Sequence, residues 1–237
     1  MLTQLFQSDS ELVNVHDLAH LIVSQELPGT TVKTDGIDGD PYAFLTVVNL
    51  NACWDHPAIS ALSNYLLAKC EDDTTLLQIL RPSRDPSSTS HIGLILSERL
   101  INMPIQVVPP LYRMLRDEMK TAIREDKPCL FSYYAMVSRT YHMPHEDGHV
   151  DSGAESGPPA KRPRATSNKH NPRFHSYHHE DDVWEELGQG SHHFRYTHHN
   201  PQEVDSFGAE VGGKLTLLSA EHFSTLVDVI QQRYSST

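Results

Sequence analysis

One stretch of the chain, Tyr42 to Leu50 (YAFLTVVNL), constrains the fold more than any other. Nearly all of its residues are β-branched, aromatic or aliphatic, without the polar–apolar alternation of a strand that has one face in water. A second apolar run, His91 to Leu96, has the same character. Strands of this kind need cover on both faces, so the sequence predicts three layers, a central sheet with helices on each side.

The rest of the chain supplies the helices and further strands of such a fold. Apolar residues at helical spacing, with Asn14 as an N-cap and Pro109-Pro110 in a first turn, predict helices over 13–25, 56–70, 109–125 and 220–234. Strands are expected at 30–34, 42–50, 74–80, 91–96, 130–141 and 214–218, with HHFRYTHH (192–199) as a further strand. Residues 1–237 are therefore expected to form a single α/β (α+β) domain.

One segment breaks this pattern. From about 144 to 172 the chain is rich in Gly, Ser, Pro and charge, and its apolar surface is too small to offset the entropy lost on ordering. We predict a disordered insertion between two core elements. It contains the basic cluster Lys161, Arg162, Pro163 and Arg164, which is typical of a signal for a nuclear import receptor. The alternative is a basic patch that only keeps the loop soluble.

Charge limits the partners of the chain. Lys and Arg total 19 against 31 Asp and Glu, a net charge of -12. Such a surface repels nucleic acid and anionic membranes and attracts basic proteins, so we expect no direct nucleic-acid binding. Cys53, Cys70 and Cys129 form no disulfide pattern, which fits a reducing compartment. With no signal peptide and no apolar membrane span in the sequence, we expect a soluble intracellular protein.

Several acidic clusters contribute to that charge, at 35–40, 71–73 and 180–186. Each cluster alone is typical of a solvated loop or a helix start. Together they provide the negative surface that a basic client protein needs. The candidate client-facing residues are Glu71, Asp72, Asp73, Glu180, Asp181 and Asp182.

Histidines are concentrated in a short region, at positions 175, 178, 179, 192, 193, 198 and 199. A zinc or nickel site is one interpretation. However, no cysteine accompanies these histidines, and neighbours on a strand point to opposite faces, so each pair offers one imidazole to a given site. We expect solvent-facing histidines and predict no metal site.

Enzyme signatures are weak. EELGQG (Glu185 to Gly190) is similar to the pyrophosphate-binding turn of acetyl-CoA enzymes, but its glycines follow a helix and nearby carboxylates would repel a nucleotide. A helix C-cap at Gly188 explains this motif better. His16 and Asp17 are expected to form a solvated pair, and GxSxG, P-loop and HExxH motifs are absent. We therefore predict neither catalytic nor cofactor-binding residues.

The stretch from Gly93 to Met119, GLILSERLINMPIQVVPPLYRMLRDEM, resembles the BCCIP/Bcp protein family. The resemblance extends to DPYAFLTVVNLN, EDDVWEEL and GGKLTLLSAEHF. It implies the fold of the GCN-five-related acetyltransferases, a twisted mixed sheet flanked by helices, without acetyltransferase activity. It also implies a nuclear chaperone and transport adaptor that shuttles to the cytoplasm. The implied partners are a basic large-subunit ribosomal protein and a phosphatidylinositol phosphate kinase whose nuclear export it assists. The alternative is an acyl-CoA-dependent N-acetyltransferase on the same fold.

Within this stretch, Leu94, Leu96 and Leu100 are expected in the core. Glu98 and Arg99 are expected to pair with each other or with neighbours where the strand leaves the sheet. The apolar connection that follows must be covered by the domain or by a partner, and Met and Pro side chains suit recognition surfaces. The candidate partner-binding residues are Glu98, Arg99, Asn102, Met103, Pro104, Val107 and Val108.

Overall fold

The computed structural model describes residues 1–85, 87–143, 174–197 and 209–235. Its strands are β1 (Gly29–Val32), β2 (Ala43–Asn49), β3 (Ile92–Arg99), β4 (Tyr133–His142), β5 (Phe174–Ser176), β6 (Gly190–Phe194) and β7 (Glu210–Ser219). Its α-helices are α1 (Leu2–Phe6), α2 (Val15–Ser24), α3 (Pro57–Lys69), α4 (Thr74–Leu80), α5 (Val108–Arg124), α6 (Asp181–Leu187) and α7 (Phe223–Tyr234). Short 3-10 turns are η1 (Gln7–Asp9), η2 (Arg81–Arg84), η3 (Ile105–Val107) and η5 (Ala220–His222).

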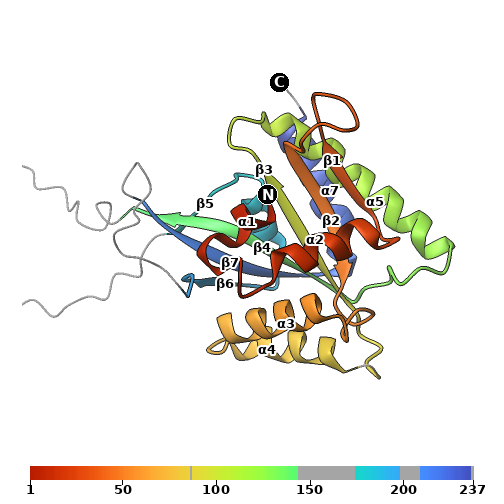
Figure 1. Cartoon of the computed structure of the whole chain (residues 1–237), viewed down its shortest axis with the longest axis vertical. Helices are drawn as coiled ribbons and strands as arrows, with labels where there is room; N and C mark the ends of the chain where they lie inside the picture. The colour runs from red at the N-terminus through yellow and green to blue at the C-terminus, as the bar shows by residue number, and fades with distance from the viewer. Residues whose placement is uncertain (86, 144–173, 198–208, 236–237) are drawn as a thin grey trace, which may run out of the picture.

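The strands form one mixed sheet in the order β1-β2-β3-β4-β7-β6, with β5 paired to the C-terminal end of β4 (Figure 1). β3 and β4 run parallel, and the other pairs are antiparallel. The β3–β4 connection crosses over through α5, as parallel neighbours require. The chain is therefore a mixed α/β protein, and the parallel pair β3–β4 lies in the middle of the sheet.

Two separate cores, one on each face of the sheet, confirm the three layers. All seven residues of β2 are buried. Phe44 and Val48 pack into a core with residues of α1, α2, α3 and α4. Leu45 and Val47 pack into the other core, with α5, α6 and α7. Because strand side chains alternate between faces, two-sided cover buries every position of β2. Its two polar residues are hydrogen-bonded, Thr46 to the Pro28 carbonyl and Asn49 to the Pro128 carbonyl.

The predicted strand over 74–80 is wrong, because these residues form α4. The Asp73 carboxylate accepts hydrogen bonds from the Thr75 and Leu76 amides, both at 3.0 Å, and so caps the helix. Leu76 and Leu80, one turn apart, are the buried residues of the helix. The Asp-Thr-Thr start is thus an N-cap signal, and it outweighs the strand preference of the apolar residues that follow it.

The Asp73 cap leads to a prediction that distinguishes the loss of a helix cap from the loss of a surface charge. Asp73→Ala should lower the free energy of unfolding by about 1 kcal/mol, because two helix amides lose their acceptor. Asp72→Ala removes an equal charge from an exposed side chain and should change it by less than about 0.5 kcal/mol. Urea unfolding of both variants is the measurement. Equal losses would mean that the cluster acts through charge alone.

The other predicted elements are confirmed with shifted ends. β3 continues to Arg99, beyond the predicted end at Leu96, and β6 ends at Phe194, well before His199. The predicted insertion at 144–172, with the basic cluster at 161–164, lies outside the described residues. No helix of the described residues has the length and apolar character that a membrane span needs. Cys53, Cys70 and Cys129 are free thiols, half-buried in the first case and buried in the others.

Candidate functional site

The parallel strands β3 and β4 part at a defined point. They pair from Ile92 with Tyr133 as far as Leu96 with Val137. Beyond it, β3 stays with β2, whereas β4 stays with β7 and gains β5. Figure 1 shows the two strands diverging after their shared pairs. Parting strands leave space between them at the centre of the sheet, so the side chains that fill it decide what the site can do.

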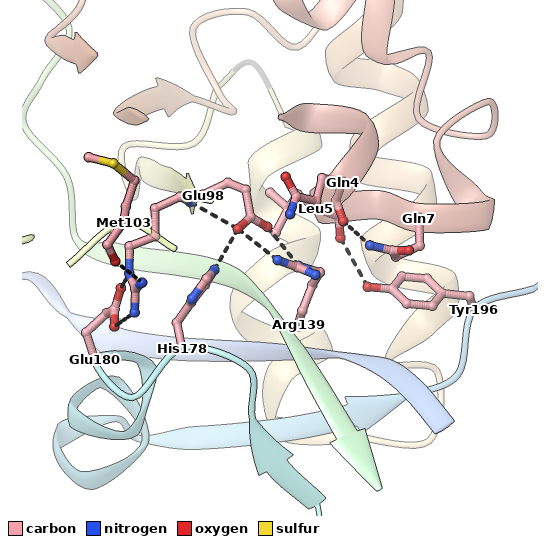
Figure 2. Close-up of polar contacts among 10 residues, drawn as sticks. Gln4, Leu5, Gln7, Glu98, Met103, Arg139, His178, Glu180 and Tyr196 are labelled. Atoms are coloured by element: carbon pink, nitrogen blue, oxygen red, sulfur yellow. Dashed lines mark hydrogen bonds and ion pairs between the residues drawn. The ribbon is translucent and has the colours of Figure 1, made fainter. Parts of the chain in front are cut away.

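Glu98 lies just past the parting point, with 1% of its surface exposed. Its carboxylate accepts two hydrogen bonds from Arg139 of β4, from Nε at 2.8 Å and from Nη2 at 3.0 Å. His178 Nε2 lies 2.6 Å from the same carboxylate (Figure 2). Arg139 is itself buried, and its guanidinium stacks on the Tyr177 ring. Glu98 and Arg139 thus form a buried bidentate ion pair that bridges the parted strands.

Arg99 forms the second ion pair. Its Nε and Nη2 donate to the two carboxylate oxygens of Glu180 at 2.7 and 3.1 Å. Its Nη1 donates to the Met103 carbonyl at 2.9 Å. One guanidinium therefore joins the end of β3, the residue before α6 and the apolar connection to α5. We call Glu98, Arg99, Arg139, His178 and Glu180 the buried ion-pair cluster.

The cluster determines how neighbouring groups ionise. Burial acts to raise the pKa of Glu98, but hydrogen bonds from His178 and Arg139 outweigh burial and hold that pKa below its ordinary value. For Asp181, burial and the adjacent Glu180 raise the pKa well above the ordinary value, and the attraction of Lys214 is too weak to offset them. On β7, the buried Lys214 ammonium donates to Glu185 and Ser176, both at 2.9 Å. Buried charges in this region are thus mostly paired.

The first residues of the chain cover the parted strands on one face. α1 contacts both β3 and β4. Tyr196 OH donates to the Leu5 carbonyl at 3.1 Å, and Figure 2 shows these two residues beside Arg139. Asp9 is fully buried, accepts hydrogen bonds from Thr197 and pairs with Lys69 at 2.8 Å. The N-terminal segment is therefore an integral part of the domain.

The structure separates the predicted partner-binding residues into two groups. Glu98, Arg99 and Val108 are buried, so they do not belong to a surface. Glu98 and Arg99 were expected to pair either with each other or with neighbours, and they pair with neighbours. Leu94 and Leu96 lie in the core as predicted, whereas Leu100 is half-buried. Solvent reaches the other four candidates: Asn102 and Pro104 are exposed, and Met103 and Val107 are half-buried.

The predicted acidic surface also needs correction. Glu180 and Asp181 are each 3% exposed, so they do not face a client; ion pairing and helix packing hold them inside. Asp73 is half-buried and caps α4. The exposed candidates are Glu71, Asp72 and Asp182.

The prediction that the histidines face solvent is wrong for His178, which is 5% exposed and contacts Glu98. Its neighbour His179, in the turn before α6, is exposed. Positions 175, 192 and 193 are half-buried, and 198 and 199 lie outside the described residues. Within the described ranges, no three His, Cys, Asp or Glu side chains form a group that could hold a metal ion.

Gly188 follows α6 as predicted, but for a different reason. Its φ is -69°, so it does not supply a left-handed cap. A Cβ at this position would lie 2.7 Å from the Trp184 carbonyl and 2.9 Å from Thr216, so only glycine fits. The turn packs against β7 and is a structural close approach. His16 and Asp17 lie 3.5 Å apart on the surface, as the predicted solvated pair.

Sequence reasoning did not identify Arg139, His178 and Lys214. The usable signal was a charged residue inside an otherwise apolar strand, as in YYAMVSRTYH and GGKLTLLS. Such a charge is either exposed at an edge or buried with a partner. Because β4 and β7 lie inside the sheet, burial follows, and each charge needs a counter-charge from another element.

Comparison with known proteins places the chain among relatives. The BCCIP family model matches residues 1–184. Protein bcp1 of Schizosaccharomyces pombe is 37% identical over 100% of this chain and 84% of its own length. Protein bcp1 of Aspergillus fumigatus is 40% identical over 96% and 78% of the two chains. The crystal structure of BCP1 from Saccharomyces cerevisiae superposes with a TM-score of 0.65 at 28% identity, covering 99% of this chain and 81% of that one. The chain belongs to the BCCIP family.

Proposed function

We propose that the chain is a non-enzymatic chaperone and transport adaptor that binds a basic large-subunit ribosomal protein in the nucleus. The observation that carries this proposal is the distribution of charge. Exposed acidic side chains outnumber exposed basic ones in the described part of the chain. The buried charges nearly cancel, because Arg99, Arg139 and Lys214 are offset by Asp9, Glu98, Glu180 and Asp181, so the net negative charge lies at the surface. Such a surface shields the RNA-binding face of a basic protein and steers its capture.

The parted strands support an acetyltransferase-like fold. Parallel neighbours that diverge are where such enzymes seat their acyl-CoA cofactor, and β3 and β4 diverge after Leu96 and Val137. In this chain the diverging ends carry Glu98 and Arg139, buried and paired to each other. A cofactor seated there would have to displace that ion pair. We therefore infer that the scaffold has exchanged cofactor binding for structural ion pairs.

The same divergence favours a second candidate, an acyl-CoA-dependent N-acetyltransferase. Equilibrium dialysis with acetyl-CoA distinguishes the two functions. The chaperone proposal expects no binding at micromolar cofactor. Saturable micromolar binding would establish the enzyme instead.

Calorimetric titration with a purified basic large-subunit ribosomal protein tests the chaperone proposal. We expect affinity to fall steeply as NaCl rises, because salt screens exposed charges within about 10 Å at 0.1 M. Neutralising the exposed Glu71, Asp72 and Asp182 together should weaken binding, whereas exchanging Glu for Asp and Asp for Glu there should not. Affinity that is independent of both salt and these substitutions would contradict electrostatic capture.

Localisation is proposed to be nuclear with passage to the cytoplasm, consistent with a partner such as a phosphatidylinositol phosphate kinase whose export it assists. The proposed import signal is Lys161 to Arg164, which a nuclear import receptor would bind. Replacing Lys161, Arg162 and Arg164 by Ala should shift a fluorescent fusion to the cytoplasm. Replacing each with the other basic residue should not. Unchanged nuclear accumulation of the Ala variant would contradict the assignment.

A further inference from the structure

β1 forms an edge of the sheet whose outer side pairs with no other described strand. β1 lies at one end of the strand order, and in the described part of the chain it pairs with β2 alone. The Val47 amide donates to the Pro28 carbonyl. In an antiparallel ladder, the backbone N–H and C=O groups of every second residue hydrogen-bond to the neighbouring strand. The backbone groups of Thr30 and Val32 therefore also point to β2. The backbone groups of Gly29 and Thr31 therefore point to the open side, and both residues are exposed.

A pocket with an acidic lining borders this edge on the α5 side of the sheet. It has a volume of about 550 Å³, and Gly29 contributes to its wall. Four carboxylates line it against a single ammonium, that of Lys127, which lies 3.2 Å from Glu125 and 3.8 Å from Glu26. Burial raises the pKa of Glu118, the least exposed of these acids, and no contribution from a positive charge opposes this shift. The lining carboxylates are Glu26, Asp117, Glu118 and Glu125.

A second, apolar pocket borders the same edge on the opposite face. It has a volume of about 470 Å³, and Thr31 contributes to its wall. Its other walls come from α1, α2 and β2, and Val23 on its rim is 87% exposed. The apolar lining includes Leu2, Val15, Ala19, Ile22, Val23 and Phe44. Figure 1 shows β1 at the margin of the sheet, with α2 and α5 near it.

These three features together specify one kind of occupant. A strand added along β1 would place successive side chains alternately on the two faces of the sheet. One set would enter the acidic pocket and the other the apolar pocket. We propose that the β1 edge is a docking site for an extended segment of a basic protein in which basic and apolar side chains alternate. The proposal deepens the chaperone function, on which it rests for the basic character of the partner.

The test uses two synthetic peptides of identical composition. In the first, lysine and isoleucine alternate; in the second, the same residues are grouped, so charge is kept and alternation is lost. Fluorescence anisotropy of the labelled peptides measures their binding to the full chain. We expect the alternating peptide to bind at least about tenfold more tightly, a difference of about 1.4 kcal/mol. Equal binding of the two would overturn strand docking.

Thr31→Pro is the decisive variant, because proline removes an amide that faces outward and leaves the β1–β2 ladder intact. We expect about a tenfold loss of affinity for the alternating peptide, with Thr31→Ala within about twofold of the parent. Melting curves of both variants verify folding. Introducing Glu26→Gln and Glu118→Gln together into the parent should also lower its affinity for the alternating peptide.

Failure of this proposal is distinguishable from failure of the chaperone function. If Thr31→Pro binds the alternating peptide as well as Thr31→Ala does, the docking site is refuted. Salt-dependent capture of the ribosomal protein by the other acidic surfaces would remain in place. If neither the peptide nor the ribosomal protein binds, both proposals are refuted together.

Discussion

Glu98→Gln should lower the free energy of unfolding by about 3–5 kcal/mol at neutral pH, because it leaves the Arg139 guanidinium buried without its counter-charge. Gln keeps the size of the side chain, so the loss measures charge rather than volume. Glu98 and Arg139 are 1% and 3% exposed, respectively. Water cannot replace the missing partner at such a site. Because globular domains are stable by only about 5–15 kcal/mol, this single change should approach the limit of folding.

The matched control is another bidentate Arg–Glu ion pair, which lies on the surface. Glu186 accepts two hydrogen bonds from Arg233, both at 2.8 Å, but their side chains are 52% and 40% exposed. Solvent screens this pair, so Glu186→Gln should cost no more than about 1 kcal/mol. Denaturant unfolding of the two variants measures the difference. Equal costs would show that burial of the ion-pair cluster contributes nothing.

The pH dependence provides an independent check on Glu98. Its folded pKa is lowered from the ordinary value, so its contribution to stability is fully present above the unfolded pKa and is lost as pH falls through the folded pKa. Glu98→Gln lacks this titration. The stability gap between parent and variant should therefore shrink in acid, below about pH 4.5. A gap that stays constant down to pH 3 would contradict the assignment.

Trp184→Ala should cost about 3–5 kcal/mol, the range for removing a large aromatic from a core. Trp184 is fully buried in α6, packs near Phe223 and Tyr112, and donates from Nε1 to Tyr112 OH at 2.9 Å. The substitution leaves a cavity, and the Tyr112 hydroxyl loses a donor. It also loosens α6, whose first turn follows Glu180 of the ion-pair cluster.

The only other tryptophan of the chain is the natural control. Trp54 is 45% exposed, and Trp54→Ala should change the free energy of unfolding by about 0.5 kcal/mol or less. The two variants also separate the fluorescence signals: emission from Trp184 should lie at shorter wavelength than emission from Trp54. Similar costs for both substitutions would contradict the packing of α6.

The layered architecture could be predicted because its evidence is local. Continuous apolar runs such as Tyr42 to Leu50 indicate two-sided cover, and proline at the start of α5 marks a helix N-terminus. The error at 74–80 came from weighing apolar content above the cap. Asp73 begins a helix whose buried leucines are one turn apart.

The ion-pair cluster could not be predicted because its partners are far apart in the sequence. Glu98 contacts residues 41 and 80 positions away, and Arg99 contacts one 81 positions away. A single sequence reveals that Arg139 needs a partner, but the identity of that partner depends on how the strands are ordered. For the same reason, the buried Glu180 was mistaken for part of an acidic surface. Local charge patterns do not reveal which face of a helix start packs inward.

We propose that the acidic surface of this domain holds a basic protein partner. The decisive measurement is purification of the tagged chain from fungal cells, with the bound proteins identified by mass spectrometry. We expect a basic large-subunit ribosomal protein among the most abundant partners, strongly reduced when Glu71, Asp72 and Asp182 are neutralised and retained in the charge-conserving variant. Recovery of no basic protein, or of the same proteins with the neutralised variant, would contradict it.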